Sequence, residues 1–403
     1  MSPLVALALL WGLALLIMGV VFAAGGLVQR RLRAAAPWPG PWPRVSVIVP
    51  AKGASASFAD EIGSILDQDY PDFEVILAVQ DANDPAYGAA RDLARRRGGP
   101  KVVLAGQSQT CGQKNYNLLA GLAAADPAGR VLVFSDSGHQ APPDWLRRLV
   151  EPVAAGRGEV ASGFHQAVAE AGGLWAQAWL VCLQLMFWSR HVGFMRQPWG
   201  GATAITRSLL DHLDLAGMWS QTVVDDVTLG RRLRQADRVM QPVPDPPLLT
   251  RLQAVSWRQW FDWLNRQLIY IKFIDPASWL LLGLVSWGLL ALVLAALAAV
   301  VALAAGAAPP WFGLSAAAFL VGLVLLVHLP RTNHPQPGPL AAWTPAGVAL
   351  LFTAALGFIR NAFCRHIDWG GIRYRVGLGG RVRSITRPGL GQHDTTPPRG
   401  SRT

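Results

Sequence analysis

The amino-acid sequence predicts an α/β domain with a mostly parallel sheet, flanked by transmembrane α-helices. Charged residues make up only 15% of its 403 residues, against roughly 25% in an ordinary soluble domain, and the mean hydropathy is +0.28. Uncharged apolar runs cover residues 3–28, 276–330 and 340–359, whereas one spanning helix needs about 20 apolar residues. Between the first two runs, strand patterns alternate with helix patterns. The composition thus excludes a purely soluble or disordered protein and predicts three to four spans.

The distribution of charge predicts how the chain is oriented. The net charge is +11, yet residues 34–275 are neutral, with 23 basic and 23 acidic side chains. Three arginines follow the first apolar run, and ten arginines against two aspartates follow residue 275. Arginines beside a span tend to stay on the cytoplasmic side. We therefore expect an N-terminal signal anchor over 1–33, a cytoplasmic domain after it, and no nucleic-acid partner.

The α/β domain begins after a proline-rich linker at 37–43, which can form neither a helix nor a central strand. The pattern predicts strands at 45–49, 73–79, 101–104 and 131–134, and helices at 59–66, 86–97, 114–125 and 225–235. Strands that alternate with helices form a mostly parallel sheet.

Three aspartates stand just after predicted strands. Asp81 and Asp84 follow the second strand, and Asp136 follows the fourth. Ligands of such sheets lie outside the carboxyl ends of the strands. Aspartate is also common in turns and helix caps, so that role stays open for each residue, but three at one edge favour a ligand site. Gly200-Gly201 is isolated, so no glycine-rich loop supports ATP hydrolysis or NAD chemistry.

Two aromatic segments lie near the predicted spans. Residues 174–189 are uncharged, and they form either a buried core helix or an interfacial helix beside a lipid-acceptor entrance. In 257–268, helical spacing places Trp257, Trp260, Phe261, Leu264 and Leu268 on one face and Arg266 on another. This pattern predicts an amphipathic helix on the membrane surface, with Arg266 directed at the cytoplasmic domain or at lipid headgroups.

An ordered set of motifs resembles the ceramide glucosyltransferase family, which are membrane-bound GT-A glycosyltransferases of the family 2/21 type. The motifs are Pro50-Ala51-Lys52-Gly53, Tyr70 to Val75, Val79-Gln80-Asp81, Asp84-Pro85, Lys114 to Leu118, Asp136-Ser137-Gly138, Asp225-Asp226, and the C-terminal segments Ile367 to Trp369 and Arg373 to Arg375. The resemblance covers nearly the whole chain and implies a nucleotide-diphospho-sugar transferase fold.

The resemblance also implies roles for single residues around a nucleotide-sugar donor. Asp84 is expected near the nucleotide, and Asp136 is expected to hold a divalent cation, Mg²⁺ or Mn²⁺, on the diphosphate. The other residues expected to contact the donor are Lys52, Asp81, Lys114 and Asn117. His139 either joins the metal shell or is a turn residue.

Two further residues are expected to act in catalysis. Asp226 matches the family's general base, and its place at a helix start favours the ionised carboxylate; Asp225 is expected to cap or orient. Arg266 matches the arginine of the family's Gln-or-Arg, two residues, Arg-Trp motif and could bind the leaving diphosphate. The tryptophan of that motif is replaced by Gln267.

We therefore expect a membrane-bound inverting glycosyltransferase that moves a hexose, glucose being the expected one, from a UDP-sugar to a lipid hydroxyl. The acceptor is a ceramide-like lipid, a hopanoid or a diacylglycerol. The alternatives are a processive polysaccharide synthase and, from another class, a transporter or receptor with a cytoplasmic regulatory domain. With only four lysines among 36 basic residues, the composition indicates a bacterial protein of the inner membrane.

The expected segments are the anchor (1–33), a cytoplasmic catalytic domain (34–256), an interfacial helix (257–275), transmembrane or interfacial helices (276–363) and a basic tail (364–403). Three spans after residue 275 would export a tail with eight arginines, against the positive-inside tendency. We therefore expect 340–359 only to dip into the interface.

Overall fold

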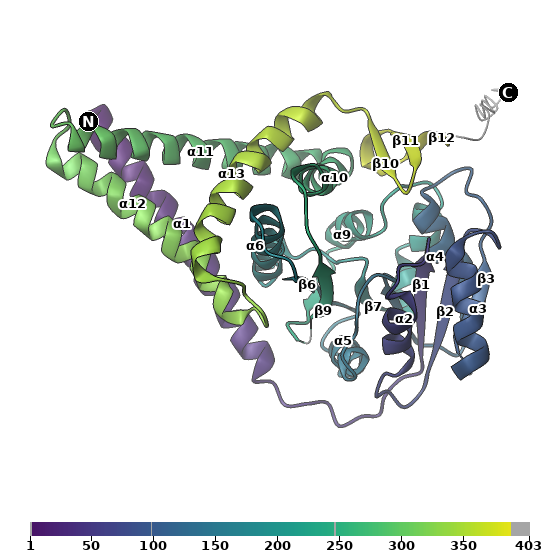
Figure 1. Cartoon of the computed structure of the whole chain (residues 1–403). Helices are drawn as coiled ribbons and strands as arrows, with labels where there is room; N and C mark the ends of the chain where they lie inside the picture. The colour runs from purple at the N-terminus through teal and green to yellow at the C-terminus, as the bar shows by residue number, and fades with distance from the viewer. Residues whose placement is uncertain (1, 98, 246, 388–403) are drawn as a thin grey trace.

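The computed structural model describes residues 2–97, 99–245 and 247–387. An α/β domain forms one part of the molecule, and three long apolar helices extend from it to one side (Figure 1). A short C-terminal sheet lies against the α/β domain at the opposite side from these helices.

The main sheet has seven strands in the order β3-β2-β1-β4-β7-β5-β8. Strands β1 (Val45–Ala51), β2 (Phe73–Val79), β3 (Lys101–Leu104) and β4 (Val131–Ser135) are parallel, as predicted. β7 (Ala202–Thr206) runs antiparallel to β4 and to β5 (Val160–Ser162), and β8 (Gln241–Pro242) completes the edge. The sheet is therefore mixed, with its parallel half first in the chain.

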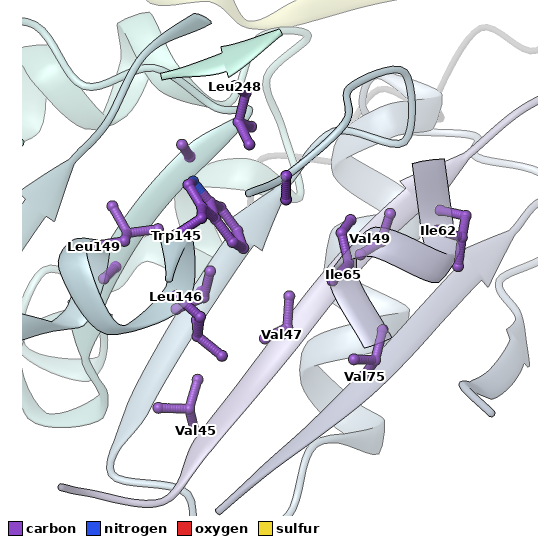
Figure 2. Packing of buried hydrophobic residues seen from close by; sticks show 14 of the residues in the cluster. Val45, Val47, Val49, Ile62, Ile65, Val75, Trp145, Leu146, Leu149 and Leu248 are labelled. Carbon is purple, nitrogen blue, oxygen red and sulfur yellow. The ribbon is translucent and has the colours of Figure 1, made fainter. Parts of the chain in front are cut away.

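Helices cover both faces of this sheet because its central strands are apolar on both sides. Figure 2 shows one face, where Val45, Val47 and Val49 of β1 pack against α2 (Phe58–Leu66) and α5 (Trp145–Ala154). α3 (Pro85–Arg97) covers the same face. Ile48 points to the other face, which is covered by α4 (Gln113–Ala124), α7 (Arg207–His212), α8 (Leu215–Trp219) and α9 (Asp226–Gln235).

α6 (Leu174–Ser189) is a core helix, one of the two alternatives for its segment. It packs on the small parallel sheet of β6 (His165–Ala169) and β9 (Leu248–Leu252). Its two glutamines are buried, and Gln184 donates to the Pro330 carbonyl at 2.7 Å. The Trp188 indole donates to the Phe22 carbonyl at 2.8 Å, so α6 joins the α/β domain to the first apolar helix.

α10 (Trp257–Ile274) begins at a Ser256 capping box, and its apolar stripe differs from the prediction in what it contacts. Trp260, Leu264 and Leu268 are buried against α6 and α13 (Leu340–Phe363). Only Trp257, at the start of the helix, is 38% exposed. The stripe faces protein where its pattern predicted the membrane, because α13 returns from far along the chain to cover it.

Four helices of the described chain are long and apolar enough to cross a membrane: α1 (Pro3–Arg33), α11 (Pro276–Ala304), α12 (Pro310–His328, continued to Asn333) and α13. The first three pack together around Trp11, Ala296 and Phe319. α13 differs, because both of its ends lie near the domain ends of the other helices. His328 at the end of α12 bonds Thr344 at 3.1 Å, and Lys272 at the end of α10 donates to the Ala362 carbonyl at 2.9 Å.

The segment predicted as a basic tail is a folded sheet up to Thr386. Its strands are β10 (His366–Trp369), β11 (Ile372–Val376) and β12 (Val382–Thr386). Tyr374 is fully buried, and the Val223 amide donates to the Gly380 carbonyl at 3.1 Å. The predicted tail residues beyond 387 lie outside the described residues.

Candidate active site

Lys114 joins two carboxylates at the edge of the main sheet. Lys114 lies in the first turn of α4, Asp136 follows β4, and Asp225 precedes α9. The ammonium group lies 2.8 Å from Asp136 Oδ1 and 3.0 Å from Asp225 Oδ2. The Asp136 side chain is 30% exposed and that of Asp225 only 6%. Asp136 is therefore the one of the two that stays open to a ligand.

Asp226 is the first residue of α9, and backbone amides hold its carboxylate. The Val227 amide donates to Oδ1 at 2.6 Å, and the Gly200 amide donates to Oδ2 at 3.1 Å. A Cβ at position 200 would lie 2.1 Å from Asp225 Oδ2 and 3.0 Å from Lys114 Nζ. Only glycine fits there, so the Gly200-Gly201 pair, which the sequence pattern left without a role, is part of the site.

The pKa values of Asp136 and Asp226 are shifted in opposite directions. Burial alone would raise the pKa of Asp136, but Lys114, together with His139 and Arg266, holds that pKa below its usual value. Burial, together with the charge of Asp225, raises the pKa of Asp226 to about 6 despite Lys114. Asp226 thus titrates near the range where a carboxylate can accept a proton in catalysis.

The residues expected at the nucleotide lie in the loops after β1 and β2. Asp84 Oδ1 accepts the Gly53 amide at 2.7 Å and the Ala86 amide at 2.9 Å. Asp81 Oδ1 accepts the Asn83 amide at 2.9 Å. Both aspartates therefore make turn and cap contacts, and Asp84 also joins the two loops.

Lys52 and Asn117 contact other parts of the protein. The Lys52 ammonium donates to the Gly370 carbonyl of the C-terminal sheet. Asn117 is only 3% exposed; its amide donates to the Ala78 carbonyl at 3.3 Å and its oxygen accepts from Gln113 at 2.9 Å. Asn117 therefore holds α4 to β2, in contrast to the donor contact expected for it, because the helical turn directs its side chain into the core.

Arg266 lies on α10 and borders a cavity of about 770 Å³. Its charge contributes to the low pKa of Asp136, which agrees with the first of the two directions predicted for it, toward the cytoplasmic domain. The cavity extends from Arg266 to Trp179 of α6, Trp263 of α10 and Arg360 near the end of α13. One arginine is thus shared between the carboxylate site and a cavity beside the apolar helices.

His139 lies close to Asp136 and is 9% exposed. Burial lowers its pKa to about 4, against the opposing effect of Asp136, so its imidazole is neutral at pH 7. No group of three or more His, Cys, Asp or Glu side chains in the described residues could hold a metal. A cation at Asp136 would therefore take most of its ligands from a bound phosphate and water, which is common for Mg²⁺.

Sequence reasoning missed the part that the C-terminal sheet takes in the site. The Tyr374 hydroxyl accepts the Gln113 amide at 3.1 Å, one residue before Lys114. The Val382 amide donates to the Gln221 carbonyl at 2.8 Å, four residues before Asp225. The sequence did contain a signal, because residues 372–376 (Ile-Arg-Tyr-Arg-Val) alternate apolar side chains with arginines at the period of a strand.

Comparison with known proteins matches these features to one family. The family model described as "Glycosyl transferase family 21" matches residues 11–382, a range that takes in the carboxylate site, Arg266 and strands β10 and β11 of the C-terminal sheet. The chain belongs to glycosyltransferase family 21. It is therefore an enzyme that transfers a sugar, and the transporter or receptor alternative is removed.

Two known proteins are similar to this chain, one in part of its sequence and one in its fold. A ceramide glucosyltransferase of Komagataella phaffii is 40% identical over 52 residues, which are 13% of this chain and 10% of that protein. A mannosyltransferase from Pyrobaculum calidifontis, solved in complex with GDP-Man and Mn²⁺, superposes with a TM-score of 0.51. At 22% identity, covering 87% of this chain and 99% of that one, the likeness identifies the fold. The α/β domain of the family 21 chain has the GT-A-like fold that the motifs implied.

Proposed function

We propose that this glycosyltransferase moves a hexose, glucose being the expected one, from a UDP-sugar to the hydroxyl of a membrane lipid by a single inverting displacement. Asp226 takes the proton of the acceptor hydroxyl, whose oxygen forms a bond to the anomeric carbon. The bond from that carbon to the diphosphate oxygen breaks, and UDP leaves. Ceramide-like lipids, hopanoids and diacylglycerols all offer such a hydroxyl.

One observation carries the proposal: the charge of Lys114 acts on two carboxylates whose pKa values are shifted in opposite directions, Asp136 with a lowered pKa and Asp226 with a raised one. Displacement at a sugar carbon needs a base on the acceptor side and charge stabilisation on the leaving-group side. Asp226, with a pKa of about 6, suits the first task. Asp136, ionised over the whole neutral range, suits the second.

Charge stabilisation on the leaving side is assigned to Asp136 and Arg266. Asp136 would hold Mg²⁺ or Mn²⁺ together with diphosphate oxygens, and the bound cation would neutralise charge on the departing UDP. Arg266 can contact phosphate oxygens directly with its guanidinium group. Lys52, Asp81 and Asp84 lie in the loops after β1 and β2 and would contact the nucleotide.

The acceptor is assigned to the cavity beside Arg266. Its volume of about 770 Å³ suits a lipid headgroup with part of its chains. Trp179 and Trp263 line it, and tryptophan favours the boundary between headgroups and tails. Because the cavity lies between α10 and the end of α13, a lipid can enter from the membrane without leaving it entirely.

We further propose that α1, α11 and α12 span the membrane while α13 lies along the cytoplasmic interface. Both ends of α13 lie on the domain side, so it does not need to cross. The C-terminal sheet then shares the cytoplasmic side with the catalytic domain, as its contacts with Val223 and Gln113 require. This topology keeps the arginines inside.

The test is UDP release by the detergent-purified full chain with a panel of UDP-sugars and a bacterial lipid extract, with and without EDTA. We expect release that needs both lipid and a divalent cation, and a product that carries one hexose of inverted configuration by mass spectrometry and NMR. Asp92→Asn is the matched control for variants, since Asp92 forms an exposed surface ion pair with Arg95. A product with a long sugar chain would support the processive synthase instead, and an Asp226→Asn rate equal to that of the wild type would remove the assigned base.

A further inference from the structure

Four side chains from separate segments form a cluster beside the carboxylates of the candidate active site. The proposed function gives this cluster no role. We name it the imidazole cluster; it consists of His139, His165, Trp199 and Thr250. The His165 ring stacks on the Trp199 ring at a centroid distance of 4.5 Å and an angle of 7°. The His139 ring lies 5.0 Å from each of these two rings.

The Thr250 hydroxyl connects the two histidines. Its Oγ1 lies 2.9 Å from His139 Nδ1 and 2.7 Å from His165 Nδ1. The hydroxyl has only one proton. It can therefore donate a hydrogen bond to one of the two rings and must accept a hydrogen bond from the other. The two imidazoles are then opposite tautomers, and their Nε2 atoms present one hydrogen-bond donor and one acceptor. Neither Nε2 atom forms a hydrogen bond to another of the described residues. Neither is among the fully buried side-chain atoms that lack a hydrogen-bond partner.

The place of the cluster relates it to the reaction. His139 comes three residues after Asp136, and Trp199 directly precedes Gly200, whose amide holds Asp226. The cluster therefore extends from the carboxylate assigned to the leaving diphosphate to the carboxylate assigned as base. In an in-line displacement the transferred ring lies between these two ends.

We propose that the imidazole cluster is the recognition surface for the transferred hexose of the nucleotide sugar. This inference rests on the proposed function and names the residues that bind the hexose and distinguish it from other sugars. Each hexose hydroxyl is both a donor and an acceptor, and the two Nε2 atoms complement this. The Thr250 hydroxyl is a positioning group, because it sets the tautomer and the orientation of both rings without itself needing to touch the sugar.

The test compares binding of UDP-glucose and of UDP to the purified full chain without acceptor, for wild type, Thr250→Val and Thr250→Ser. Valine keeps the shape of threonine and removes the hydroxyl, whereas serine keeps the hydroxyl. We expect Thr250→Val to weaken UDP-glucose about tenfold, the effect of one or two lost hydrogen bonds, with UDP binding unchanged. Thr250→Ser should restore UDP-glucose binding to within about threefold of the wild type.

Thr353→Val is the matched control, because Thr353 is also a threonine whose hydroxyl contacts an aromatic side chain, in this case the Trp260 indole, at 3.2 Å. It should leave both affinities unchanged. His139→Gln should show the same selective loss as Thr250→Val and provides a second route if the valine variant is unstable.

Equal weakening of UDP and UDP-glucose, or no weakening of either, would overturn the inference and leave the proposed function in place. An altered acceptor KM with unchanged UDP-glucose affinity would also overturn it, because the cluster would then line the acceptor path. If the wild-type chain binds and uses no UDP-hexose, the proposed function fails and the inference fails with it.

Discussion

Asp136 and Asp226 both interact electrostatically with Lys114, but their environments favour different chemistry. Asp136 follows β4 and has the Lys114 ammonium 2.8 Å away, which holds its pKa low. Asp226 begins α9, and burial together with the adjacent carboxylate of Asp225 raises its pKa to about 6. The difference teaches that residue type does not decide the role here. Burial and the neighbouring charges decide it: Lys114 of α4 acts on Asp136, and burial together with the adjacent Asp225 acts on Asp226.

The largest expected effect separates the two carboxylates by function. Asp226→Asn removes the proposed base and should lower kcat by roughly 10²–10⁴-fold, while the affinity for UDP-sugar stays within about twofold. Steady-state kinetics and donor binding on the same sample check this. If the variant instead loses donor affinity and keeps its kcat, Asp226 contacts the donor. The separate roles assigned to Asp136 and Asp226 would then be wrong.

The next effect tests the lysine that the two environments share. Lys114→Met leaves Asp136 and Asp225 without their common cation and should lower the free energy of unfolding at pH 7 by roughly 1–3 kcal/mol, between the values for exposed and buried pairs. The deficit should shrink as the pH falls through about 6, the pKa of Asp226, because protonation of Asp226 removes one of the negative charges that Lys114 offsets. Thermal melts in detergent between pH 5 and 8 measure it. A pH-independent deficit would point to lost packing and not lost charge.

The pH dependence of the wild-type enzyme tests the raised pKa directly. A base works when deprotonated, so kcat/KM should be level above pH 7 and fall as the pH drops through about 6, by about tenfold per unit once well below it. Donor binding to Asp136 should stay constant over that range, because the pKa of Asp136 is shifted the other way. Activity that remains level down to pH 4.5 would contradict the assignment.

The smallest expected effect comes from Asp225, the neighbour whose charge helps to make the pKa of Asp226 higher than that of Asp136. Asp225→Asn removes the charge that raises the pKa of Asp226, so the acid limb of the pH profile should move to lower pH by up to about one unit. The shift corresponds to about 1.4 kcal/mol at most. The matched control is Asp92→Asn, a neutralised aspartate on the surface. An acid limb that moves to higher pH would show that the main effect of Asp225 is to hold Lys114.

Much of the fold could be predicted because its signals are local. The four parallel strands and the helices between them occur within two residues of their predicted ends, since apolar runs and turn residues are read from neighbouring positions. The helix at 257–274 was also predicted, but not the partner of its apolar stripe. The helical spacing of apolar residues indicates that one face of the helix is buried, but it does not show whether protein or lipid covers that face. The packing of α13 on α10 could therefore not be inferred.

The candidate site shows the same division. The positions of Asp136 and Asp226 at element ends follow from local pattern, and their assignment to a sugar transferase is supported by the family match. The Lys114 ion pairs, the close approach of Gly200 and the shared hydroxyl of Thr250 each join segments 22 to 111 residues apart. Asn117 illustrates the reverse, since it belongs to a matching motif and yet bonds inside the core.

Local pattern therefore determined the class of the protein: an α/β domain with aspartates at its sheet edge, next to helices that are apolar enough for a membrane. Tertiary packing decided which aspartate has a raised pKa, which apolar helix is covered by protein, and that the C-terminal sheet contacts the site. The physical reason is that pKa and burial depend on distances across space. Periodicity along the chain fixes which face of an element is apolar, but only packing brings a specific charge or side chain up to it.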